Sequence, residues 1–174
     1  MKTSHFFFVC LLNLFCLSPM LACSCDWEGP FLEMSQESDL VVRVKVLEHQ
    51  KMMEIYEDSI PNAMIVEILE IYQGEEERKQ LKVWGDNGFL CRPYLSMFPI
   101  GSEWVLSLQK GEQIIEGAEK EDFSISICGE TVLPVKDGQL EGVIFSRNVI
   151  KGTDGFKVHT QKLSLSGLKE AFGS

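Results

Sequence analysis

The sequence predicts a mainly β protein: a small, closed or partly closed Greek-key barrel of five strands, with short flanking helices and a C-terminal hairpin plus helix. Three observations predict this class. Five short runs are rich in β-branched and aromatic residues, turn residues separate these runs, and the chain shows no internal repeat. Five strands with one buried face fit a small barrel better than a sandwich of seven strands.

The first predicted elements are a short helix and a strand. A proline opens the run 30–38, which carries apolar residues on one side and is typical of a short helix. Apolar and basic residues alternate in the run 40–46, so we expect Val42, Val44 and Val46 to face the core. The other predicted strands cover residues 64–72, 81–84, 104–108 and 123–128, with a long loop over residues 85–101.

The C-terminal part is predicted to form a hairpin and an amphipathic helix. Asp137-Gly138 is typical of a tight hairpin turn, with residues 142–145 as the return strand or the next strand. In the run 163–172, Leu165, Leu168 and Phe172 recur at helical spacing after Ser164, a candidate N-cap. We expect this helix to pack on the barrel.

The first residues of the chain have the pattern of a secretory signal. Lys2 precedes an apolar run over residues 6–17, and a small residue, Ala22, marks the cleavage point. A membrane anchor is the alternative, but the run is short for a span of about 20 residues and Asn13 interrupts it. The predicted organisation is therefore a signal at 1–22, a barrel at 23–135 and a C-terminal hairpin and helix at 136–174, in an exported protein.

The charge balance excludes two classes of partner. The chain carries 26 acidic against 16 basic residues, a formal net charge of −10. A nucleic-acid-binding protein or a polybasic membrane-surface protein would carry a basic stripe instead. We expect no nucleic-acid partner, and membrane association only through a lipid on Cys23.

Four cysteines remain after cleavage: Cys23, Cys25, Cys91 and Cys128. An even number of cysteines in an exported chain of this size predicts disulfide bonds. A bond between Cys23 and Cys25 would strain the preferred disulfide geometry, because one residue separates them. The two pairings that remain both join the mature N-terminus to two distant segments.

Several features follow one another in a recognisable order along the chain. They are the mature start Cys23-Ser24-Cys25, the short helix, residues 38–46, residues 70–74, Cys91 and the run 125–128. This order resembles the netrin-type module of the tissue inhibitors of metalloproteinases over residues 23–135, in a divergent, bacterial-like form. The resemblance implies an OB-type barrel of five strands. It also implies the disulfides Cys23–Cys91 and Cys25–Cys128.

The resemblance further implies an inhibitor of zinc metalloendopeptidases, not an enzyme, that needs no cofactor and holds no metal of its own. The free amine and the carbonyl of Cys23 would chelate the catalytic zinc of the target at its open position. Ser24 would point into the specificity pocket of the protease. Cys25, Phe89 and Leu90 would complete the contact surface.

Two alternatives remain open. Residues 20–23 partly resemble a bacterial lipobox, and lipidation would acylate the amine of Cys23. The protein would then be an envelope lipoprotein with the same binding module and no inhibitory activity. A thiol-disulfide enzyme using Cys23 and Cys25 is the third hypothesis. In every case the expected location is extracytoplasmic: secreted, periplasmic or lipid-anchored.

Overall fold

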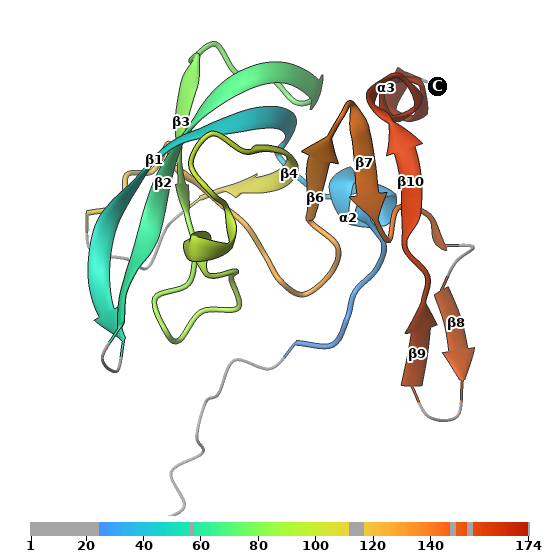
Figure 1. Cartoon of the computed structure of the whole chain (residues 1–174), viewed down its shortest axis with the longest axis horizontal. Helices are drawn as coiled ribbons and strands as arrows, with labels where there is room; N and C mark the ends of the chain where they lie inside the picture. Colours follow the sequence, from blue (N-terminus) through green and yellow to red (C-terminus); the bar gives the residue numbers. More distant parts are fainter. Residues whose placement is uncertain (1–24, 56–57, 112–116, 147–148, 153–154, 174) are drawn as a thin grey trace, which may run out of the picture.

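The computed structural model describes residues 25–55, 58–111, 117–146, 149–152 and 155–173 (Figure 1). The predicted signal at 1–22 lies outside these ranges, and so do Cys23 and Ser24. Within the described ranges, no helix is long and apolar enough to cross a bilayer.

The elements follow one another as short strands with a helix near each end of the described chain. In chain order they are α2 (Phe31–Gln36), β1 (Leu40–Ile55), β2 (Asp58–Gln73), β3 (Gln80–Trp84), the 3-10 turn η1 (Leu95–Met97), β4 (Glu103–Lys110), β5 (Phe123–Ser124), β6 (Val132–Lys136), β7 (Gln139–Gly142), β8 (Val149–Gly152), β9 (Gly155–Val158), β10 (Gln161–Ser164) and α3 (Leu165–Gly173).

Five strands close into a barrel. β1 pairs with β2 on one side and with β4 on the other, β2 pairs with β3, and β5 lies parallel to β3 and antiparallel to β4. The order around the closed ring is therefore β1-β2-β3-β5-β4 and back to β1. This is the order of an OB-type Greek-key barrel, so the predicted fold class is confirmed.

The barrel interior follows the predicted alternation of β1. Val42, Val44 and Val46 are at most 1% exposed and belong to the same buried cluster. Arg43 points outward and makes an ion pair with Glu103 on β4. Because side chains alternate along a strand, the pattern of β1 determines which of its faces lines the core.

A second core lies outside the barrel and joins the C-terminal part to it. Phe31 of α2 and Val41 of β1 share this core with Leu140 of β7 and Leu168 of α3. All four side chains are fully buried. Figure 1 shows β6, β7 and β10 as a sheet beside β4, with α2 and α3 against it. The predicted packing of the C-terminal helix on the barrel is therefore present.

The predicted hairpin is present between β6 and β7. Asp137 and Gly138 have φ values of 50° and 73°, the left-handed conformations that a type I′ turn requires. The return strand ends at Gly142, however, so the predicted strand over residues 142–145 is wrong beyond its first residue. Residues 143–145 instead cover α2, where Val143 and Ile144 carbonyls accept hydrogen bonds from the first helical N–H groups.

Other elements also differ from the predictions. β1 and β2 are each 16 residues long and pair from Val41↔Gln73 to Ile55↔Asp58, with three register shifts in the first half of β1. The β8–β9 hairpin was not predicted. The predicted strand at 123–128 ends at Ser124, because the chain leaves the barrel there and returns to β4 only as β6.

Ser164 caps the C-terminal helix as predicted. Its Oγ accepts a hydrogen bond from the Gly167 N–H at 3.0 Å. We expect Ser164→Ala to lower the free energy of unfolding by about 1 kcal/mol, since it removes the acceptor. Ser164→Asp keeps an acceptor and should preserve stability in urea denaturation. Equal losses in both variants would contradict a capping role.

Candidate functional site

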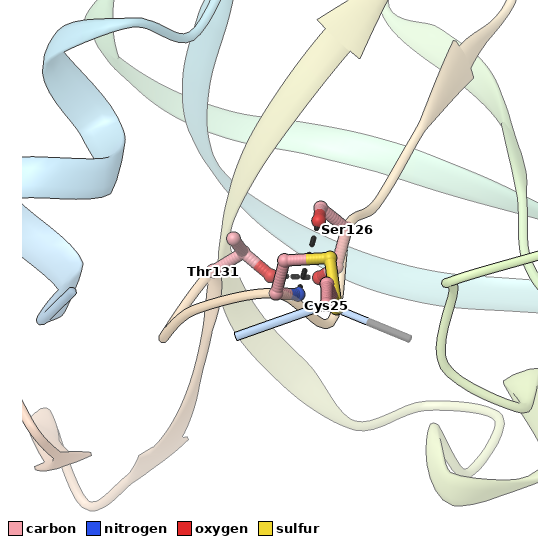
Figure 2. The surroundings of a disulfide bond; sticks show 4 residues. Cys25, Ser126 and Thr131 are labelled. Atoms are coloured by element: carbon pink, nitrogen blue, oxygen red, sulfur yellow. Dashed lines mark hydrogen bonds between the residues drawn. A yellow bond between two sulfur atoms is a disulfide. The ribbon is translucent and has the colours of Figure 1, made fainter. Parts of the chain in front are cut away.

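Three cysteines from distant parts of the chain meet at one edge of the barrel. The Sγ atoms of Cys25, Cys91 and Cys128 lie within 4.8 Å of one another. Cys25 and Cys128 form a disulfide with a Cα–Cα distance of 5.4 Å, so this predicted bond is present (Figure 2). Cys91 is also disulfide-bonded. Its predicted partner Cys23 lies outside the described residues, and the Cys23–Cys91 bond stays a prediction.

Two hydroxyl groups of the loop between β5 and β6 make hydrogen bonds around Cys128. Thr131 Oγ1 donates to the carbonyl of Ser126 at 2.5 Å, and the Cys128 N–H donates to Ser126 Oγ at 3.1 Å (Figure 2). These two bonds fold the loop back on itself. Its two ends are held on β4 by the strands β5 and β6. The position of Cys128 is therefore determined by the loop together with the disulfide.

The N-terminal segment is attached to the same loop by backbone hydrogen bonds. The Glu28 N–H donates to the Cys128 carbonyl at 2.6 Å, and the Glu130 N–H donates to the Gly29 carbonyl at 2.9 Å. A Cβ atom on Gly129 would lie 2.5 Å from the sulfur of Met34, so a larger residue here would require the Met34 side chain to move. The disulfide and these bonds keep the start of the described chain on the loop.

The loop after β3 is shaped by two side-chain carbonyl oxygens. The buried carboxylate of Asp86 accepts the Leu90 N–H at 2.9 Å, and Asn87 Oδ1 accepts the Phe89 N–H at 3.2 Å. In this loop Phe89 is 83% exposed, whereas Leu90 is half-buried. The Cys91 carbonyl accepts the Ile127 N–H at 3.1 Å, which joins this loop to the β5–β6 loop.

A half-buried arginine lies at the base of the same loop. Burial lowers the pKa of Arg92, and the charge of Asp86 offsets part of this effect. An arginine keeps its charge despite such a shift, because its ordinary pKa is far above neutrality. The charge of Asp86 therefore favours the charged form of Arg92 at the base of the loop.

These segments form one continuous surface, which we call the cysteine edge: Cys25, the loop 86–92 and the loop 125–131. It brings together the predicted contact residues Cys25, Phe89 and Leu90. Cys23 and Ser24 would precede it directly in sequence. The edge offers exposed apolar groups and a covalently held N-terminal segment. Cys25 and Cys128 are bonded to each other, so their sulfurs are not free metal ligands.

Sequence reasoning missed one apolar residue of the cysteine edge. Ile127 is 51% exposed, whereas Ile125 is 1% exposed. The predicted strand at 123–128 would have put both side chains on one face, but the strand ends at Ser124 and the alternation ends with it. The sequence offered one signal for the exposure of Ile127. It directly precedes Cys128, which had to reach the N-terminal segment at the surface.

Acidic groups border the edge on the N-terminal side. Asp26 and Glu28 are exposed beside Cys25, and Trp27 between them is partly buried. Two exposed carboxylates therefore lie next to the start of the cysteine edge.

Comparisons with known proteins assign no family to this chain: searches of protein-family models and of curated proteins found no match. The resemblance to the netrin-type module consequently rests on the order of the sequence features.

Proposed function

We propose that this protein is an exported inhibitor of zinc metalloendopeptidases, which acts through the N-terminal amine and carbonyl of mature Cys23. The observation that carries the proposal is the cysteine edge. Its disulfide holds Cys25 beside two loops, and these loops expose Phe89 and Ile127. A segment held this way loses little conformational entropy when it binds a partner.

The chemistry of the proposal belongs to the first two mature residues. An α-amine and the carbonyl of the same residue can form a five-membered chelate on a zinc ion that has an open coordination position. The amine must be unprotonated, and its ordinary pKa of about 7.7–8.0 makes that inexpensive near neutral pH. Inhibition should therefore weaken as the pH falls below neutrality, because protons then compete with the metal.

The first experiment determines the chemical state of the N-terminus. The intact mass of the exported protein should equal that of a chain starting at Cys23 with its disulfides and without added acyl groups. That material should inhibit members of a panel of zinc endopeptidases and leave serine and cysteine proteases active. A diacyl or triacyl addition at Cys23 would instead support the lipoprotein alternative, because an acylated amine cannot bind zinc.

Phe89 should be a main apolar contact of the inhibitor. Phe89→Ala should weaken inhibition by about 30-fold, since an exposed aromatic side chain buried at an interface contributes about 2 kcal/mol. Its matched control is Ile100→Ala, because Ile100 is 62% exposed and lies in the turn before β4. Inhibition constants for both variants provide the measurement. A similar loss in both would argue against a contact at the cysteine edge.

A further inference from the structure

The loop that exposes Phe89 contains the sequence Asn87-Gly88. An asparagine side chain can be attacked by the backbone nitrogen of the next residue, and this attack is easiest when that residue is glycine. The reaction needs an accessible backbone N–H, a polarised side-chain carbonyl and freedom at the residue that follows. The loop around Asn87 meets each of these requirements.

The nucleophile is accessible. Gly88 is exposed, and across the described part of the chain its N–H donates no hydrogen bond. Its φ of 92° is a conformation that glycine adopts readily and other residues adopt rarely. The absence of a Cβ atom also removes the main steric obstacle to attack on the preceding side chain.

The electrophile is polarised and its leaving group is unrestrained. Asn87 Oδ1 accepts the Phe89 N–H at 3.2 Å, and a donor at this oxygen stabilises negative charge that develops there during attack. The Nδ2 group of Asn87 donates no hydrogen bond to any described residue. Nothing among the described residues therefore holds the amide that must leave.

We infer that Asn87-Gly88 is a site of spontaneous deamidation that changes the charge of the cysteine edge with time. The Gly88 nitrogen, after losing its proton to solvent base, forms a bond to Asn87 Cγ. The bond from Cγ to Nδ2 breaks, and ammonia leaves with a proton. Water then opens the cyclic imide at either carbonyl, which yields aspartate or isoaspartate.

The product differs from the native loop in two ways that matter at a contact surface. A carboxylate appears two residues before Phe89, and binding would have to remove water from it. Isoaspartate also lengthens the backbone between residues 87 and 88, which shifts the Phe89 side chain. The effect on inhibition rests on the proposed function, whereas the chemical modification does not.

The modification is tested on the full mature chain, incubated at 37 °C and then mapped by peptide mass. The peptide that contains residues 87–88 should gain the mass of an amide-to-acid exchange, with ammonia released in equal amount. The rate should rise about tenfold from pH 7 to pH 8, because the deprotonated nitrogen becomes more abundant. Asn87→Gln should lose the reaction, since its side chain must form a larger ring.

Asn62 is the internal control in the same digest. It is 9% exposed, and the next residue is Ala63, which pairs with Trp84 in the sheet. Asn62 should stay intact while Asn87 reacts. An Asn87 that reacts only in the urea-unfolded chain would overturn the inference, because the fold would then protect the site.

The inhibition assay separates the two levels of the proposal. Asn87→Asp should inhibit at least about tenfold less than the native chain, which corresponds to a loss of about 1.4 kcal/mol. Equal potency of the two would overturn the change of function at this edge. Absence of inhibition by the native chain itself would overturn the proposed function, and peptide mapping would still decide the modification.

Discussion

The double variant Cys25→Ser/Cys128→Ser is expected to lose about 4 kcal/mol of the free energy of unfolding, because the predicted Cys23–Cys91 bond already shortens the loop that this disulfide closes. The disulfide joins residues 103 positions apart, and a cross-link over such a loop restricts the unfolded chain strongly. Small domains are stable by only about 5–15 kcal/mol, so this loss removes a large share. Urea denaturation followed by the fluorescence of buried Trp84 would measure it.

Thr131→Val is the matched control for the disulfide experiment. It removes the hydroxyl that closes the loop on the Ser126 carbonyl and leaves both cysteines in place. Its expected cost is about 1 kcal/mol, the contribution of one hydrogen bond. A double-serine variant that loses no more than this control would show that the cross-link contributes little. A changed urea dependence would indicate that the denatured state has changed instead.

One alanine added before Cys23 is expected to abolish inhibition. The extra residue moves the free amine by about 3.8 Å, the distance between consecutive Cα atoms. A zinc–nitrogen bond is only about 2.0–2.1 Å long, so the displaced amine cannot bind in the same pose. Inhibition constants should rise at least about 100-fold, which corresponds to about 2.8 kcal/mol.

The extended protein must be shown to be otherwise native. Its free energy of unfolding should match that of the parent, and peptide mapping should recover the Cys25–Cys128 bond. Unchanged potency in such a protein would rule out the chelate mechanism, whatever the inhibition panel shows. Lost potency together with a scrambled disulfide would call for repeating the comparison on correctly bonded material.

Several elements could be predicted because their causes are local. The turn at Asp137-Gly138 needs positive φ angles that these residue types tolerate, and Ser164 supplies its own acceptor to the helix N-terminus. The alternation of Val42, Val44 and Val46 likewise appears in the sequence before any partner strand is known. Each of these features depends on residues a few positions apart.

Other elements could not be predicted because their causes lie far away in the sequence. The second half of β1 is rich in polar residues, and it is a strand because β2 pairs with it, as in Met52↔Pro61. Ile125 and Ile127 follow the same alternation, yet one is buried and the other exposed. The difference arises because β5 and β6 both pair with β4, whereas the segment between them leaves the barrel.

The sequence by itself determined the existence of the five barrel strands, the hairpin turn, the capped helix and the residue types available for a contact surface. Only the tertiary structure decided that Cys25, Cys91 and Cys128 meet at one edge and that Phe89 and Ile127 are exposed beside them. The physical reason is the range of the interactions. Backbone preference and side-chain periodicity act over a few residues, whereas closure of β1 on β4 and the disulfide join segments that are distant in the chain.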